Sequence, residues 1–125
     1  MAHLHSDRIF MEGLQFYAFH GRNAEEREVG QPFVVDLEAE LDLRAAGLSD
    51  RISDTISYTH LYRAVKAEME APPKDLLESV AESIAQRLLD CFPILAVRVR
   101  LKKTRPPIRG AVLSAAGVEL YRTRD

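Results

Sequence analysis

Residues 33–43 alternate between apolar and polar side chains, and this pattern constrains the fold more than any other segment of the chain. The odd positions are all apolar, whereas the even positions from Asp36 to Asp42 are all acidic. Successive side chains of a β-strand point to opposite faces, so the segment predicts a long strand with one buried and one solvated face. Such a strand requires a second apolar layer to cover its buried face.

Residues 97–102 show the same alternation, with cationic residues on the polar side, and Lys103 follows with the parity of the apolar positions. A strand that continues through Lys103 would therefore direct its ammonium group toward the buried face. Burial of a charged amine is unfavourable unless the amine is paired or gives up its proton, and a lysine in that position can act as an acid or a base. Alternatively, the strand ends at Lys102, and Lys103 begins a solvated turn before Pro106.

Two further strands are indicated near the ends of the chain. Residues 8–19 are apolar on both parities, with Gly13 as a candidate bulge, and residues 118–122 alternate again. The first strand would pair with the 33–43 strand across a charged loop at residues 21–31. Because a strand that is apolar on both faces needs cover on both, the first strand favours an oligomer assembled through the edges of its sheets.

Two helical segments lie between residues 59 and 92, separated by Pro72 and Pro73. Thr59 is a suitable N-cap for the first helix, and residues 75–78 have the pattern of a capping box that opens the second. The apolar residues of both segments recur at helical spacing. The order ββααββ predicts an α+β fold, in which an antiparallel four-stranded sheet carries two helices on one face.

Composition sets modest bounds on function. The 125 residues suffice for a single domain, residues 1–125, with 1–6 expected to form a flexible tail. A net charge of -2 disfavours binding to nucleic acid or a membrane surface through overall charge. No apolar run approaches the roughly 18 residues of a membrane helix, and the N-terminus lacks a signal-peptide core. We therefore expect a cytoplasmic protein.

Four groups of residues are candidates for chemistry, and Lys103 is one of them. A second is the charged loop with Glu25, Glu26 and Glu28, which is either a solvated loop or one that turns a glutamate inward to bind a nitrogen-rich ligand. A third is Tyr58, which precedes the expected cap Thr59. As a hydrophobic staple it should meet an apolar residue, but the partner position is Arg63. Tyr58 is therefore also a candidate to stack on a ring and transfer a proton.

The fourth group is the Leu76-Leu77-Glu78 segment at the start of the second helix. Glu78 occupies the position of a capping-box carboxylate, and the pattern alone favours capping. The alternative is that Glu78 accepts two adjacent N–H groups of a guanidine-like heterocycle as a fork.

The joint order of these groups resembles the dihydroneopterin aldolase family, over about residues 7–122. Five blocks carry the resemblance: FYAFHG at 16–21, Glu26 followed by EVGQ at 28–31, DTISY at 54–58, LLE at 76–78 with AE at 81–82, and KTRPPI at 103–108. The resemblance implies the tunnelling fold (T-fold), in which four subunits join their sheets into an oligomeric barrel. Two such rings would stack into an octamer, with active sites between neighbouring subunits.

The implied activity is that of a lyase of folate biosynthesis. It would cleave 7,8-dihydroneopterin into 6-hydroxymethyl-7,8-dihydropterin and glycolaldehyde, with epimerisation at the 2′ carbon as a side reaction giving dihydromonapterin. By the same resemblance, Glu78 would grip the pterin N–H groups beside the Leu77 backbone. Tyr58 of an adjacent subunit would stack near the ring, and Glu26 would line the side-chain end. Lys103 would be the general acid/base.

No cofactor is expected. A retro-aldol cleavage needs a base and an electron sink, and the conjugated C=N of the dihydropterin ring supplies the sink, so neither a Schiff base nor a metal is required.

Three competing interpretations remain open. A dihydroneopterin triphosphate 2′-epimerase would share the proton chemistry. A zinc-dependent pterin enzyme would need three histidines from among His3, His5, His20 and His60, of which the first two lie on the expected tail. A nucleic-acid-binding module would use the basic residues between Arg98 and Arg109, but that stripe has no interleaved aromatic residues.

Overall fold

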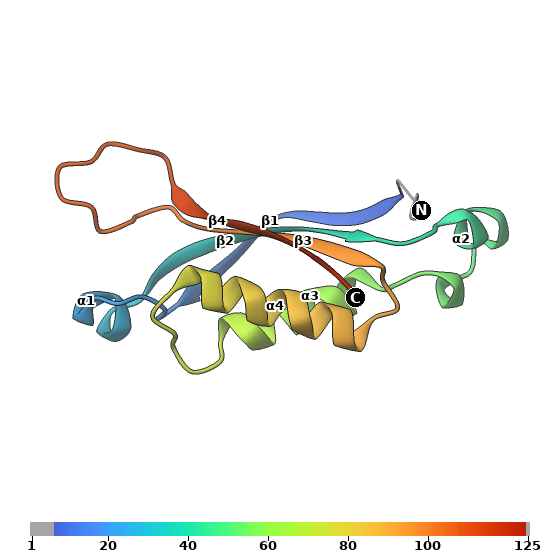
Figure 1. Cartoon of the computed structure of the whole chain (residues 1–125), viewed down its shortest axis with the longest axis horizontal. Coiled ribbons are helices and arrows are strands. Elements are labelled where there is room, and N and C mark those ends of the chain that lie inside the picture. The colour runs from blue at the N-terminus through green and yellow to red at the C-terminus, as the bar shows by residue number, and fades with distance from the viewer. Residues whose placement is uncertain (1–6, 125) are drawn as a thin grey trace.

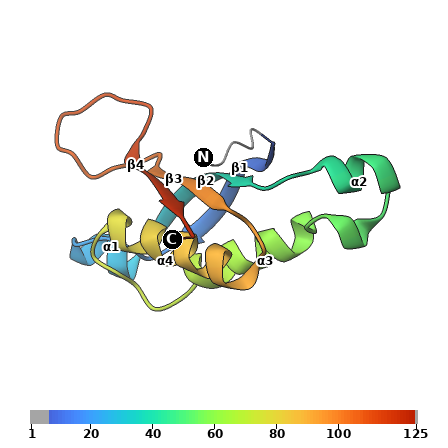
Figure 2. The same ribbon diagram turned by 45° about the vertical axis from the view of Figure 1, so that its right-hand side comes forward.

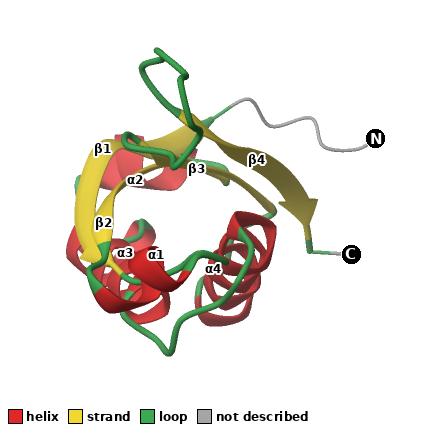
Figure 3. Ribbon diagram, turned by 90° about the vertical axis from the view of Figure 1, so that its left-hand side faces the viewer, coloured by secondary structure: helices red, strands yellow, loops and turns green. Residues whose placement is uncertain are grey.

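The computed structural model describes residues 7–124, whose four strands form one antiparallel sheet with two long helices against one face (Figure 1). The strands are β1 (Arg8–Ala18), β2 (Gln31–Glu40), β3 (Ala96–Lys103) and β4 (Ala116–Thr123), and they neighbour one another in chain order. The helices are α3 (Tyr58–Met69) and α4 (Leu77–Cys91). The sheet curves around both helices, as the end view shows (Figure 3).

Three short helical elements interrupt the expected ββααββ order. They are α1 (Ala24–Glu28), α2 (Arg44–Ser49) and the 3₁₀ helix η1 (Ile52–Asp54). In Figure 2, α1 and α2 lie at opposite ends of the molecule. The segment at residues 21–31 is therefore not simply a charged loop, because the Asn23 N–H donates to Glu26 Oε1 at 3.3 Å and begins a helical turn there. A five-residue helix is too short to produce a detectable apolar period.

The sheet confirms the two-residue alternation and the position of Lys103. Residues of β2 are alternately buried and half-buried along its whole length. Lys103 is the last residue of β3 and pairs with the fully buried Phe33 across the strands. The interpretation that the strand ends at Lys102 is therefore wrong. The β1–β2 register shifts between Met11 and Leu14, which places the predicted bulge at Gly13, where φ is 69°.

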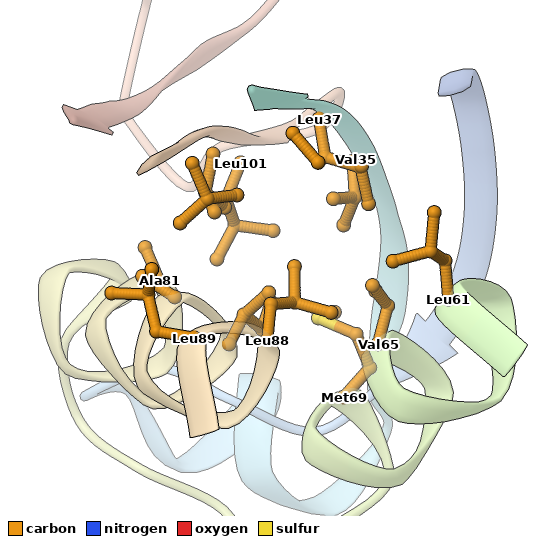
Figure 4. Close-up of a cluster of buried hydrophobic side chains, with 14 of the residues drawn as sticks. Val35, Leu37, Leu61, Val65, Met69, Ala81, Leu88, Leu89 and Leu101 are labelled. Atoms are coloured by element: carbon orange, nitrogen blue, oxygen red, sulfur yellow. The ribbon is translucent and has the colours of Figure 1, made fainter. Parts of the chain in front are cut away.

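The core lies between the sheet and the two long helices. Leu61, Val65 and Met69 of α3 are fully buried, as the spacing predicts. The buried residues of α4 are Val80, Ala81, Ile84, Ala85, Leu88 and Leu89. Figure 4 shows side chains from both helices meeting Val35, Leu37 and Leu101 of the sheet. Burial of this apolar stripe on each helix holds the helix ends in place, including the start of α4, which borders the pocket described below.

Both predicted helix starts need correction. The N-cap of α3 is Ser57 rather than Thr59, so Tyr58 is the first helical residue. The N-cap of α4 is Leu76, and no side-chain cap forms there. Asp75, the expected cap, is instead paired with Arg27 of α1. The predicted capping role of Glu78 is therefore wrong.

The open face of the sheet carries charges that pair across the strands. Arg98 and Arg100 of β3 both bond to Glu119 of β4, at 3.2 and 3.1 Å. Arg8 lies 3.3 Å from Glu38. This pairing occupies Arg98 and Arg100, two of the cations that the nucleic-acid hypothesis relied on. Within the described part of the chain, no helix is long and apolar enough to cross a membrane.

Candidate active site

A pocket of about 560 Å³ lies where α1, the start of α4 and the β3–β4 loop meet. Four of the five predicted site residues line it: Glu26, Leu77, Glu78 and Lys103. Arg22, Asn23 and the Pro106-Pro107-Ile108 segment complete much of its wall. The fold thus brings residues from Arg22 to Val118, which are distant in the sequence, to one place.

Lys103 and Glu26 form the central contact of this pocket. Lys103 Nζ donates to Glu26 Oε2 at 2.5 Å, and the two side chains are only 14% and 7% exposed. Lys103 extends from the end of β3 on the helix-covered side, and Glu26 extends from α1. The buried ammonium expected from strand parity is therefore paired with a carboxylate. This pairing offsets the unfavourable free energy of burying an unpaired charge.

Glu26 is held by two further hydrogen bonds. Gln31 Nε2 donates to Oε2 at 2.5 Å, and the Asn23 N–H donates to Oε1. Burial raises the pKa of the Glu26 carboxyl, but the hydrogen bonds from Lys103, Gln31 and Asn23 outweigh it, and the pKa lies below its usual value. Glu26 is therefore ionised at neutral pH. Among the three glutamates of the segment, the structure selects Glu26, because it alone of Glu25, Glu26 and Glu28 is buried.

Gln31 is a residue of the site that sequence reasoning missed. It is 7% exposed, and its Oε1 has no hydrogen-bond partner within the described structure. The signal was present in the sequence, because Gln31 has the parity of Phe33 and Val35 and so points to the buried face of β2. A buried amide on an apolar face indicates a polar partner nearby.

Gly21 makes room for the Glu26 carboxylate. Its φ is 143°, and a Cβ atom added there would overlap the Glu26 side chain. Both the backbone angle and the lack of a side chain are therefore required at this position.

Glu78 lies in the first turn of α4, and its side chain forms no hydrogen bond or ion pair with any residue in the 7–124 range. It is exposed in the single chain and is free to accept hydrogen bonds from a ligand. A carboxylate is favoured at this end of a helix by the helix dipole. The adjacent Leu77 is half-buried and packs against the core.

The sequence model of the dihydroneopterin aldolase family matches residues 9–121 of the chain. The chain belongs to the dihydroneopterin aldolase family. Its activity is accordingly that of a lyase, the aldolase of the folate pathway. It is 43% identical over 120 residues to dihydroneopterin aldolase 1 of Arabidopsis thaliana, an alignment covering 95% of this chain and 82% of the plant protein.

Solved structures of dihydroneopterin aldolases share this fold. A putative dihydroneopterin aldolase from Vibrio cholerae matches with a TM-score of 0.87 and 34% identity, covering 97% of this chain and 100% of that chain. The E. coli dihydroneopterin aldolase, solved in complex with neopterin, matches with a TM-score of 0.84 and 33% identity, covering 93% and 98%.

Tyr58 is the one predicted residue of this aldolase that does not line the pocket of its own chain. It is 64% exposed at the N-terminus of α3, whereas Met69 at the C-terminus of α3 accepts a hydrogen bond from His20, whose neighbour Gly21 adjoins Glu26. The 12 residues of α3 separate its two ends by about 17 Å at 1.5 Å per residue. Tyr58 therefore lies far from Lys103 within one chain.

His20, which belongs to the FYAFHG block, does not line the pocket and instead forms hydrogen bonds with the backbone. Its Nε2 donates to the Met69 carbonyl at 2.8 Å, and its Nδ1 accepts the Lys74 N–H at 3.1 Å. Burial lowers the pKa of His20, so the ring is neutral. Across residues 7–124, no three His, Cys, Asp or Glu side chains gather in a group that could hold a metal ion. His3 and His5 lie outside the described residues.

Proposed function

We propose that the pocket around the Lys103–Glu26 pair is where 7,8-dihydroneopterin is cleaved into 6-hydroxymethyl-7,8-dihydropterin and glycolaldehyde. The observation that supports this most directly is a paired, largely buried lysine in the same pocket as an unpaired carboxylate, Glu78. The first can move a proton, and the second can bind the N–H groups of a heterocycle.

In this mechanism Glu78 accepts the 2-amino and ring N–H groups of the pterin beside the Leu77 backbone. The trihydroxypropyl side chain then extends toward Glu26 and Lys103. Because Glu26 is ionised and fixed by three hydrogen bonds, it holds the Lys103 ammonium in one place. A preorganised proton donor of this kind lowers the cost of orienting the reacting groups.

The chemical step breaks the bond between C1′ and C2′. The neutral amine of Lys103, acting through an ordered water, removes the 2′-hydroxyl proton while the electron pair passes to C1′ and the conjugated C=N of the ring. This produces the Lys103 ammonium, which Glu26 stabilises. Glycolaldehyde is released from C2′ and C3′, and the ammonium returns its proton to C1′. The ring is the electron sink, so the proposed step is independent of a metal. If the aldehyde rotates and adds back before leaving, the 2′ centre is epimerised to give dihydromonapterin.

Tyr58 would complete this site from a neighbouring subunit. Its exposure and its distance from the pocket of its own chain support that arrangement. Two aromatic side chains of β1, Phe10 and Tyr17, are 58% and 57% exposed in the single chain. They support a further proposal, that subunits join through sheet edges into a ring and that two rings form an octamer. Aromatic residues are enriched at protein interfaces relative to the rest of the surface.

The test is to incubate the purified protein with 7,8-dihydroneopterin, without added metal, and to follow pterin products by chromatography. Formation of 6-hydroxymethyl-7,8-dihydropterin with glycolaldehyde supports the proposal, and a monapterin peak reports epimerisation. Binding without conversion, combined with turnover of the triphosphate, would favour the dihydroneopterin triphosphate epimerase instead. Absence of both reaction and binding would overturn the assignment of the pocket.

A further inference from the structure

The two walls of the pocket are contributed by distant segments, and Arg27 connects them. One wall is the turn from Gly21 to Glu26, which carries the reacting pair with Lys103. The other is the start of α4, which carries Leu77 and Glu78. Arg27 itself does not line the pocket.

Arg27 uses both sides of its guanidinium for this connection. Its Nε donates to the Gly21 carbonyl at 2.7 Å, and its terminal NH2 nitrogen pairs with Asp75 Oδ1. Gly21 adjoins Glu26, as the overlap of an added Cβ shows, and Asp75 precedes Leu76, the N-cap of α4. One planar group with donors on two nitrogens therefore spans the two walls, and a lysine lacks this fixed fork.

Two hydrogen bonds that do not involve Arg27 also join the walls. The Gly21 N–H donates to the Lys74 carbonyl at 2.9 Å, and His20 accepts the Lys74 N–H. These bonds fix the backbone of residues 20–21 against Lys74 and do not involve Arg27, so the fold should be retained when Arg27 is replaced. Loss of Arg27 would instead free α1, which carries Glu26, from Asp75 at the start of α4.

We propose that Arg27 is a positioning residue that sets the span between the ring-binding wall at Glu78 and the reacting pair Glu26–Lys103. The proposal rests on the proposed function of the pocket. A substrate that bridges both walls depends on this span, whereas a ligand that contacts only the ring-binding wall does not. Small displacements of reacting groups are sufficient to reduce turnover strongly.

The experiment compares Arg27→Gln with wild type, using two ligands. For 7,8-dihydroneopterin we expect kcat/KM to fall about tenfold or more in the variant. For unsubstituted pterin, which lacks the side chain, we expect the dissociation constant to change less than about twofold. A general loss of structure would instead weaken both to the same extent and would overturn the proposal.

Three further variants sharpen the result. Arg27→Lys keeps the charge but not the double contact, and it should recover only part of the activity. Asp75→Ala should behave like Arg27→Gln, and combining the two should cost little more than either alone, because they remove the same connection. Arg87→Gln is the matched control, since Arg87 also pairs across two elements, at 2.5 Å from Glu68, and is similarly exposed.

The outcomes separate the two proposals. If wild-type protein does not turn over 7,8-dihydroneopterin, the proposed function fails. If wild type is active and Arg27→Gln matches Arg87→Gln in both measurements, only the role of Arg27 is overturned.

Discussion

The ammonium group of Lys103 and the carboxylate of Glu26 lie 2.5 Å apart, from residues 77 positions apart in the sequence. Each is largely shielded from water, so each depends on the other for its charge to be tolerated. The pair is therefore the proposed proton-transfer group, and its integrity also affects the free energy of unfolding. The two roles can be measured separately.

Replacement of Lys103 by alanine should abolish turnover while retaining pterin binding. We expect kcat to fall by about 100-fold or more, in the range typical of a lost general acid or base. The dissociation constant for neopterin, measured by fluorescence titration, should change little because Glu78 remains. Lys102→Ala is the control, since Lys102 lies on the opposite face of β3. Equal loss of binding and turnover in Lys103→Ala would contradict the assigned role.

The mutual dependence of the pair predicts non-additive stabilities. Glu26→Gln leaves the Lys103 ammonium largely buried without its carboxylate and should cost about 3 kcal/mol of unfolding free energy. The double variant Glu26→Gln/Lys103→Met should be more stable than Glu26→Gln alone, because it no longer buries an unpaired charge. Urea unfolding of the two singles and the double gives the coupling energy, and strictly additive losses would argue against the pairing.

Substitution of Gly21 should disturb the site directly. Gly21→Ala places a methyl group on the Glu26 carboxylate and forces a non-glycine residue to φ 143°. We expect destabilisation of about 1–3 kcal/mol, together with reduced aldolase activity. Gly47→Ala is the matched control in α2, because the space around Gly47 is open, and it should be neutral or slightly stabilising. Equal unfolding midpoints for Gly21→Ala and Gly47→Ala would contradict this prediction, because they would mean that the Glu26 side chain moves aside for the added methyl group without loss of stability.

The buried His20 predicts a loss of stability in mild acid. Its pKa in the folded protein is below the ordinary 6.5, so the unfolded chain takes up a proton that the native state resists as pH falls below that value. The free energy of unfolding should therefore decrease from pH 7 to pH 5, with His20 contributing up to about 1.4 kcal/mol per pH unit. Urea titrations of His20→Gln should show a shallower slope, and an unchanged slope would rule out His20 as the source.

Completion of the site by a neighbouring Tyr58 predicts complementation between inactive variants. Tyr58→Ala and Lys103→Ala should each be inactive alone. After subunits are exchanged in an equal mixture, about a quarter of the shared sites should regain both residues from different chains. Recovery of activity in that mixture, measured by product formation, is the expected result. A mixture that stays inactive despite proven exchange would place both residues in the same chain's site.

Much of the fold could be predicted from the sequence because strand parity and helix period report burial directly. Lys103 is the best example, since its parity alone indicated the helix-covered side. Short elements gave no such signal: α1 has five residues, and its start depends on the contact of Asn23 with Glu26.

The site was less predictable where long-range contacts override local patterns. Asp75 has the sequence features of a helix cap, but Arg27, 48 residues away, engages it instead. Glu78 is consequently free of the capping role that its spacing favours. The location of Tyr58 relative to Lys103 depends on a second chain in the proposed arrangement, and no periodicity within one chain can report it.

The separation of Tyr58 from its own pocket has a geometric consequence for assembly. In the ring proposed above, neighbouring chains are related head to tail, so each chain offers a tyrosine on one surface and receives one on a different surface. In any open row of subunits, one pocket at the end lacks its tyrosine. Among head-to-tail arrangements only a closed ring fills every pocket, so rotational closure of the proposed ring would be a condition for full activity.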